Sequence, residues 1–357
     1  MEVKIKTKLI PGTAALILLC TCCTVNCDSK DKTAKADTQT KATTQFTLVN
    51  WNLQTFFDGT KDGFEYSDFQ KSGNWNTQTY TVRLQRLCQF ISQVNADIYV
   101  FEEIENEAVI HDISNQLSAS GHNWNQKKFW NYSAFAKQEE TAIGIGIISR
   151  YPLSEVKAHA MDIRLHNQSQ PQTRYMLETT VSIGGRKVLL LANHWKSKSG
   201  GEEKSEIWRD WQENLLAKRI AQLTNAAEPD IPIIICGDFN RDAADFICNF
   251  EENTGQNTLL RYADFQSTEF IPVRSLWFTS EGTFATKTGS YWYDDNWEHI
   301  DNLMLTGSIS ASEFRPMTDS PWANAQGIPF GYKIYSGEGW SDHLPLWATL
   351  VNMANTL

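Results

Sequence analysis

The chain has 357 residues, of which 41% are hydrophobic and 21% are charged. This composition is typical of a soluble globular protein that is large enough to bury a sizeable core. The 42 Asp and Glu residues outnumber the 32 Lys and Arg residues, which gives a formal net charge of −10. That balance argues against a basic scaffold that coats nucleic acid nonspecifically, but it leaves room for an enzyme with a local cationic groove.

The first 27 residues have the pattern of a secretory signal. Three lysines, Lys4, Lys6 and Lys8, precede an apolar stretch over 9–19, and cysteines follow at positions 20, 22, 23 and 27. The stretch includes Pro11 and Gly12 and is too short for a membrane-spanning helix. The cysteine cluster resembles a bacterial lipoprotein signal, so lipidation and plain secretion both stay open. Either places the protein outside the cytoplasm, secreted or attached to the cell envelope.

Residues 28–45 predict a disordered tether, because alanine is the only apolar residue type among them. The folded body is therefore predicted over 46–357. No internal repeat and no second linker divides it, so we expect one domain. The body contains three cysteines, Cys88, Cys236 and Cys248. Their odd number and their spacing argue against a disulfide framework or a cysteine metal site.

Apolar runs of strand length alternate with helical patterns along the body. Strands are predicted over 46–53, 96–104, 142–150, 174–183, 186–195, 230–240, 299–307 and 343–351, and helices over 83–95 and 205–226. Many strands with helices between them indicate a layered α/β enzyme.

Polar side chains suited to metal or phosphate stand at the ends of these apolar runs. They are Asn52 in NWNL, Glu103 in VFEEIEN, His194 in ANHWKSK, Asp238 and Asn240 in GDFN, Asp301 in HIDNLML, and Asp342 with His343 in SDHLP. Each is weak evidence alone, since GDFN by itself is also compatible with an Asx turn. Together they combine hard oxygen ligands with imidazoles, which are the groups needed to hydrolyse a phosphodiester.

The order and chemistry of these motifs resemble the endonuclease/exonuclease/phosphatase superfamily, the metal-dependent phosphodiesterases related to deoxyribonuclease I. The resemblance runs over residues 47–350, and GDFN and SDHLP are its most specific parts. NHWKSK and SYWYDDNWEHIDNLML are most similar to the secreted bacterial nuclease branch. The resemblance implies an α/β (α+β) fold, a four-layer α-β-β-α sandwich of two packed mixed β-sheets with outer helices.

The same resemblance implies metal ligands. Glu103 corresponds to the principal ligand, Asn52 lies beside it, and Asp342 is expected near the metal, which is Mg²⁺ in this reading, with Mn²⁺ or Ca²⁺ as alternatives. Glu102 stands where the family usually carries glutamine. Strand alternation predicts that Glu102 points away from the metal.

It also implies catalytic roles. Asp238 orients or deprotonates the attacking water, and Asn240 holds the phosphate or the transition state. Asp301 orients His343 beside the developing negative charge. His194 protonates the leaving oxygen or binds phosphate. Phosphate contacts are expected from three basic residues near the motifs, Arg174, Lys196 and Lys198.

We therefore expect a monomeric, Mg²⁺-dependent hydrolase of phosphodiester bonds. The preferred reading is a secreted or lipid-anchored endonuclease that cleaves DNA, or RNA, with little sequence preference. One alternative is a sphingomyelinase or other phospholipid phosphodiesterase or phosphatase of the same fold. A second alternative is a binding or adhesion module on a decayed enzyme scaffold, which the complete set of motif residues disfavours.

Overall fold

A six-stranded sheet forms one half of the body. The computed structural model describes residues 43–119, 129–161, 169–224, 230–250, 255–263 and 267–352. The predicted signal and residues 28–42 of the predicted tether lie outside these ranges. The strand order is β15-β16-β1-β2-β4-β3, and β1 runs parallel to β2. The strands are β1 (Thr44–Phe56), β2 (Ile98–Ile104), β3 (Tyr132–Ala136), β4 (Gly144–Ser149), β15 (Ile309–Pro316) and β16 (Leu346–Asn352).

An eight-stranded sheet forms the other half, in the order β5-β6-β7-β8-β14-β11-β10-β9. Here β7 runs parallel to β8. The strands are β5 (Leu153–His159), β6 (Met176–Ile183), β7 (Arg186–His194), β8 (Ile233–Asp238), β9 (Ile247–Cys248), β10 (Thr258–Ala263), β11 (Thr268–Ser275) and β14 (Asp301–Thr306). A separate hairpin consists of β12 (Tyr291–Tyr293) and β13 (Asn296–Glu298).

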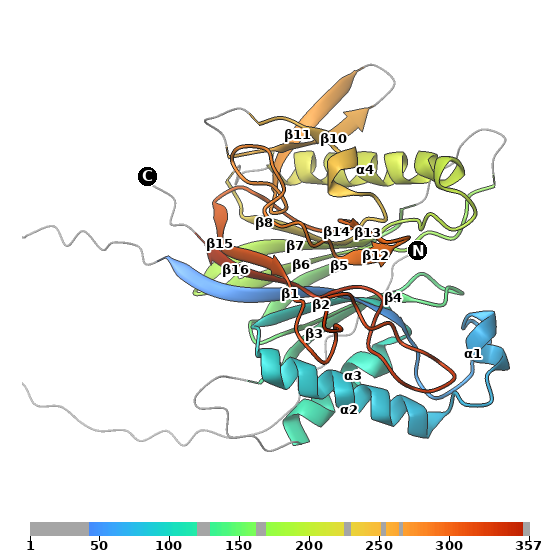
Figure 1. Cartoon of the computed structure of the whole chain (residues 1–357). Helices are drawn as coiled ribbons and strands as arrows, with labels where there is room; N and C mark the ends of the chain where they lie inside the picture. The colour runs from blue at the N-terminus through green and yellow to red at the C-terminus, as the bar shows by residue number, and fades with distance from the viewer. Residues whose placement is uncertain are drawn as a thin grey trace, which may run out of the picture. The chain divides into compact units, whose positions relative to one another are not determined.

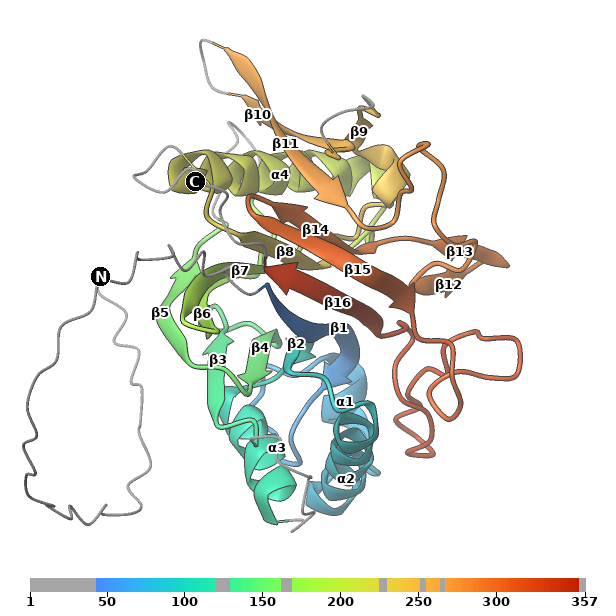
Figure 2. The ribbon, with the colours of Figure 1, turned by 90° about the vertical axis from the view of Figure 1, so that its left-hand side faces the viewer.

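Helices cover the outer face of each sheet (Figures 1 and 2). The helices α2 (Thr77–Val94) and α3 (Glu107–Ala119) pack on the six-stranded sheet, and α4 (Glu202–Thr224) packs on the eight-stranded sheet. Two shorter elements are α1 (Ser67–Lys71) and the 3₁₀ turn η1 (Ala243–Asp245). The predicted four-layer α-β-β-α sandwich is confirmed. None of the described helices has the length and apolar character needed to cross a membrane.

Three apolar cores hold the layers together. Alternating side chains of β2 show the division, because Tyr99 and Phe101 join the core under α2 and α3, whereas Ile98 and Val100 join the core between the sheets. A third core lies between the eight-stranded sheet and α4 and includes Phe239. Each sheet is therefore buried on both faces, which explains why the strands read as nearly continuous apolar runs.

Most predicted elements are present, with shifted ends. The helix predicted from residue 83 begins at Thr77, because Asn76 caps it by accepting from the backbone N–H groups of Gln78 and Thr79 at 3.0 and 3.1 Å. The first turn of this helix is polar, so no apolar residues at helical spacing mark it in the sequence. The hairpin of β10 and β11 and the edge strand β15 were not predicted, since their exposed faces break the apolar runs.

The two parallel strand pairs bring the motif residues to one edge of the sandwich. Asn52 lies beside Glu102 in the register of β1 and β2. His194 lies beside Asp238 in β7 and β8, and Asp301 lies opposite Asp238 where β14 begins. The C-terminal ends of both pairs therefore meet at this edge, as in other sheets with parallel strands.

Gly237 is required for this arrangement. Its φ is +137°, and a Cβ atom there would lie 1.9 Å from the carbonyl oxygen of Asn193 on the neighbouring strand. We expect Gly237→Ala to cost about 3 kcal/mol or more of unfolding free energy, from strain and from separation of β7 and β8. Urea denaturation measures this cost.

Gly185→Ala is the matched control. Gly185 also has a positive φ, of +79°, but its Cβ would meet nothing within 4 Å. We expect a loss of about 1 kcal/mol from the backbone conformation alone. Equal losses for the two variants would contradict a steric role for Gly237.

Candidate active site

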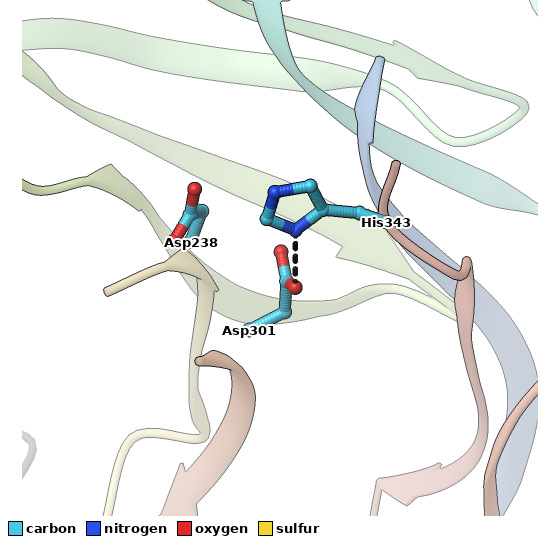
Figure 3. Close-up of side chains that lie close together, drawn as sticks. All are labelled: Asp238, Asp301 and His343. Atoms are coloured by element: carbon cyan, nitrogen blue, oxygen red, sulfur yellow. Dashed lines mark hydrogen bonds and ion pairs between the residues drawn. The ribbon is translucent and has the colours of Figure 1, made fainter. Parts of the chain in front are cut away.

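Asp238, Asp301 and His343 face one another at the edge of the sandwich (Figure 3). The Nδ1 atom of His343 pairs with Oδ2 of Asp301 at 2.7 Å. One ligand atom from each of the three residues lies within 4.8 Å of the others. All three side chains are buried. The structure thus brings together three residues that are 42 to 105 positions apart in the sequence.

Backbone contacts fix the Asp301–His343 pair in place. The N–H of Asp301 donates to the hydroxyl of Ser290 at 3.1 Å. The N–H of His343 donates to Oγ of Ser341, and that hydroxyl donates to the carbonyl of Asn52. The ring of Tyr291 lies against the imidazole, with centroids 4.8 Å apart. The orientation of His343 is therefore set by both sheets.

The surroundings raise the pKa values of both His343 and Asp238. Burial alone lowers the pKa of His343, but the carboxylates of Asp301, Asp238 and Asp342 raise it well above its ordinary value. His343 is therefore a cation at neutral pH. Burial, followed by the charge of Asp301, raises the pKa of Asp238 to about 7. A carboxylate near pKa 7 beside an imidazolium is a combination suited to acid–base chemistry.

Glu103 lies beside the same cluster, with its side chain 18% exposed. Its φ of +62° interrupts β2. Oε2 accepts from the N–H of Thr55 at 2.6 Å, and Oε1 accepts from Nδ2 of Asn52 at 3.3 Å. Burial, followed by the charge of Asp342, raises the pKa of Glu103. The carboxylate is thus held from one side and accessible from the other.

Asn52 bridges the two parts of the site. Its Nδ2 also donates to Oδ2 of Asp238 at 3.0 Å, and its Oδ1 accepts from the N–H of Gln54 at 2.9 Å. In this orientation the amide NH₂ faces the carboxylates. Asn52 therefore orients Glu103 and Asp238, and a role as an oxygen ligand would require the amide to turn.

Asp342 also lies beside the cluster. Its side chain is 42% exposed, and its Oδ1 lies 4.0 Å from Nε2 of His343. This position, beside His343 and open to solvent, is consistent with the predicted place of Asp342 near a metal.

His194 is enclosed by the acidic residues. Its Nε2 lies 3.6 Å from Oδ2 of Asp238 and 3.8 Å from Oε1 of Glu103. Burial, together with the charges of Arg174 and His343, lowers the pKa of His194 well below its ordinary value. The imidazole is neutral at pH 7, so a standing charge for binding phosphate comes from His343 rather than from His194.

Glu102 keeps the strand alternation on which its predicted direction, away from the metal, is based. It extends between the sheets on the same side as Ile98 and Val100 and is fully buried. Glu103, the residue after Glu102, has a left-handed conformation that forms a bulge in the strand. The side chain of Glu103 therefore reaches the site. Burial, followed by the charges of Asp301 and Asp238, raises the pKa of Glu102 well above its ordinary value.

The remaining predicted residues lie around this centre. Asn240, with φ of +48°, donates its N–H to Oδ1 of Asp238 at 2.8 Å. Arg174 donates to the carbonyl of Trp195 at 2.9 Å and hydrogen-bonds to Tyr66. Lys196 turns back to carbonyls of its own loop, and Lys198 pairs with Glu202 and Glu298. The two lysines are not brought against the central carboxylates, and their phosphate contacts stay predictions.

The donor set fits a divalent cation. Carboxylates gather here with few cationic neighbours, and Oδ1 of Asp301 is buried with no hydrogen bond from any described residue. Hard carboxylate oxygens are the ligands that Mg²⁺ and Ca²⁺ prefer. A second acidic cluster, Asp62, Glu65 and Glu105, lies in the loop after β1 and the turn after β2. Its oxygens accept mainly from nearby backbone N–H groups.

Comparisons with known proteins agree with the fold and place the chain in a family. The model of the Endonuclease/Exonuclease/phosphatase family matches residues 47–321. The match spans well over half of the chain, so the chain belongs to this family. Its members are hydrolases of phosphoester bonds that generally require a divalent metal. No curated protein sequence matches the chain.

Three solved structures have a similar fold at low sequence identity. Truncated TDP2 from Caenorhabditis elegans is 16% identical, covering 86% of this chain and 97% of its own, with a TM-score of 0.53. A family protein from Bacteroides thetaiotaomicron is 12% identical, with 88% and 100% covered and a TM-score of 0.52. D. rerio TDP2 in complex with a single-strand DNA product is 16% identical, with 86% and 98% covered and a TM-score of 0.50.

Glu102→Gln tests whether residue 102 is a neutral carboxyl group. A carboxyl whose pKa rises on folding from 4.5 makes the native state bind the extra proton, so stability falls as pH rises above about 4.5. The amide has the same shape and needs no proton. We expect Glu102→Gln to gain stability over the wild type by up to about 1.4 kcal/mol per pH unit above that point.

Denaturant unfolding at several pH values measures the gain. Glu107→Gln, at a side chain 63% exposed on α3, is the control and should show no such trend. A pH-independent difference for Glu102→Gln would mean that Glu102 is ionised in the folded protein.

Proposed function

We propose that this family member is a metal-dependent phosphodiesterase, an endonuclease that hydrolyses DNA with little sequence preference. The observation that carries the proposal is the cationic His343–Asp301 pair facing Asp238, with Glu103 beside them. This arrangement offers a proton acceptor, a positive charge for phosphoryl oxygens, and a carboxylate for a cation within one cluster of side chains.

Asp238 acts on the attacking water. Its carboxylate is aimed by the side chain of Asn52 and the backbone N–H of Asn240. A pKa of about 7 lets it accept a proton at neutral pH and return it easily, which is the property of an efficient general base. His343, held by Asp301 on the other side of the cluster, presents Nε2–H to a phosphoryl oxygen on which negative charge develops.

Glu103 and Asp342 would hold the divalent cation, with Asn52 orienting Glu103. When bound, the cation supplies positive charge that neutralises the phosphoryl oxygens of the substrate. Mg²⁺ is proposed because the donors are carboxylate oxygens, and Mn²⁺ is the natural substitute. Arg174, which projects from the start of the segment before β6 and lies near His194, would contact a further phosphate oxygen.

Nucleic acid is the proposed substrate on two grounds. The motifs NHWKSK and SYWYDDNWEHIDNLML resemble secreted bacterial nucleases, and D. rerio TDP2, of similar fold, holds a single-strand DNA product. The N-terminal signal pattern supports secretion or lipid attachment outside the cytoplasm. A phospholipid phosphodiesterase is the second candidate, favoured by the exposed side chains of Phe64 and Tyr66 on the loop that reaches Arg174.

Cleavage of supercoiled plasmid tests the substrate and the role of His343. We expect nicking with Mg²⁺, none with EDTA, and a loss of at least about 100-fold in rate for His343→Ala, because the charge beside the phosphoryl group is removed. His111→Ala, at an exposed position on α3, should cleave like the wild type. Hydrolysis of sphingomyelin without nicking of DNA would select the second candidate.

The pH dependence of metal stabilisation tests the site directly. Without metal, the raised pKa values of Asp238 and Glu103 make the folded state bind more protons, so stability falls as pH rises from about 4 to 7. A bound cation replaces those protons. The increase in Tm caused by saturating Mg²⁺ should therefore be larger at pH 8 than at pH 5.

Asp238→Asn should flatten this trend, because it removes one of the titrating groups. Differential scanning calorimetry gives the Tm values. An equal Mg²⁺ effect at both pH values would contradict the proposed site.

A further inference from the structure

Arg83 lies beneath the C-terminal end of β1, on α2, and only 3% of it is exposed. Its Nη2 donates to the carbonyl oxygens of Leu53 and Gln54 at 2.7 and 2.8 Å, and its Nη1 donates to that of Thr55 at 2.8 Å. Three consecutive backbone carbonyls therefore share one guanidinium. Among the described residues, the proposed ligands Glu103 and Asp342 make no hydrogen bond to Arg83, although the charges of both act to raise its pKa.

The segment that Arg83 holds has an unfavourable backbone conformation. Gln54 and Thr55 have φ values of +50° and +55°. Left-handed conformations cost energy for residues with a Cβ atom, and most for a β-branched residue such as threonine. Two in succession persist only when the surroundings enforce them. The three hydrogen bonds from Arg83 supply that enforcement.

The same turn directs its amides at Asn52 and at the proposed metal ligand Glu103. The N–H of Gln54 donates to Oδ1 of Asn52 at 2.9 Å, and the N–H of Thr55 donates to Oε2 of Glu103 at 2.6 Å. The carbonyl side of the segment is thus fixed by Arg83, and its amide side fixes Asn52 and Glu103.

We propose that Arg83 is a positioning residue that holds residues 53–55 in the left-handed turn and thereby preorganises Glu103 for a divalent cation. The inference rests on the proposed function, in which Glu103 binds the metal. Arg83, a buried residue on the outer helix, thereby influences the affinity of the site for the metal.

The surroundings of Arg83 favour arginine over lysine. Its guanidinium lies 3.7 Å from the ring centroid of Tyr332 and 4.7 Å from that of Phe56. The N–H of Tyr332 donates to Oε1 of Gln54 at 2.6 Å, so the ring belongs to the same assembly. A lysine ammonium keeps the charge but has neither the planar fork nor the stacking surface.

The first experiment measures Mn²⁺ binding to the metal-free full chain by isothermal titration calorimetry, which needs no substrate. We expect Arg83→Lys to raise the Kd for Mn²⁺ about tenfold, because Glu103 is no longer held by the N–H of Thr55. The Mg²⁺ concentration for half-maximal activity should rise in parallel, with a smaller change in kcat at saturating metal.

Arg150→Lys is the matched control. Arg150 is also buried, donates to the carbonyl of Asn95 at 3.0 Å, and lies 4.0 Å over the ring of Trp130. These contacts are at the opposite end of β2 from Glu103. We expect this variant to lose stability while its Mn²⁺ Kd stays within twofold of the wild type.

A rescue variant separates positioning from simple packing. Asparagine adopts the left-handed conformation more readily than threonine and retains the N–H. Thr55→Asn, combined with Arg83→Lys, should recover most of the Mn²⁺ affinity. Packing of α2 against the sheet would gain nothing from this change.

The outcomes distinguish the inference from the function on which it rests. An unchanged Kd in Arg83→Lys, or an equal rise in Arg150→Lys, overturns the inference alone. A wild-type chain that binds no Mn²⁺ overturns the proposed metal site and the inference with it. If Arg83→Lys does not fold, Tyr332→Leu is measured instead, and a several-fold rise in Kd is expected, whereas an unchanged Kd overturns the proposal.

Discussion

Mutual repulsion among buried carboxylates is the constraint around which this molecule is built. Asp238, Asp301 and Glu102 are fully or almost fully buried at the junction of the two sheets, with Glu103 beside them. Burial weakens solvation and strengthens repulsion, so such a cluster lowers the stability of the fold that contains it. The three apolar cores offset this cost, and the register of the paired strands prevents the carboxylates from moving apart.

The cluster resolves the repulsion in three different ways, and the differences create its chemistry. Asp301 is neutralised by the imidazolium of His343. Glu103 and Asp238 accept backbone N–H groups from Thr55 and Asn240. Glu102 accepts from Nδ2 of Asn50 at 3.4 Å, and burial, followed by the charges of Asp301 and Asp238, raises its pKa well above its ordinary value. Groups of the same type thus acquire different proton affinities from their surroundings alone, which is how a single site obtains both an acid and a base.

The residue at position 102 shows what this division requires. A neutral carboxyl group resembles the glutamine that is usual in the family, both in shape and in offering one donor and one acceptor. The raised pKa of Glu102 favours this neutral form. In its neutral form, Glu102 is therefore a conservative replacement for the glutamine.

Periodicity predicted the main strands, and the family resemblance carried by the motifs implied the layers and the shared role of the motif residues. This worked because strands buried on both faces have a strong apolar signal, and because polar residues at their ends have no place in a core. The exposed faces of β10, β11 and β15 weaken that signal, so these strands were missed. The orientation of Glu103 could not be predicted from alternation, because the register of β2 with β4 shifts between Glu102 and Ile104.

Backbone conformation accounts for what the sequence concealed at the site itself. Among the described residues that have a Cβ atom and a positive φ, Gln54, Thr55, Glu103 and Asn240 all lie at this site. None of these residue types except asparagine signals a left-handed conformation. The tertiary contacts that enforce it, such as the three carbonyl contacts of Arg83, come from a distant helix and leave no local pattern in the sequence.

This strain bears on how an acidic protein would act on the proposed phosphodiester substrate. A chain with net charge −10 offers little long-range attraction to a polyanion, and Lys196 and Lys198 are engaged with their own loop and with glutamates. Recognition must then come from short-range groups held in fixed positions: the imidazolium of His343, the guanidinium of Arg174 and the proposed cation. Such groups act only when their geometry is correct, since a flexible charge in water is quickly screened. The strained turns and the buried hydrogen bonds supply that geometry, so the fold replaces a broad basic surface with a small, rigid and desolvated centre.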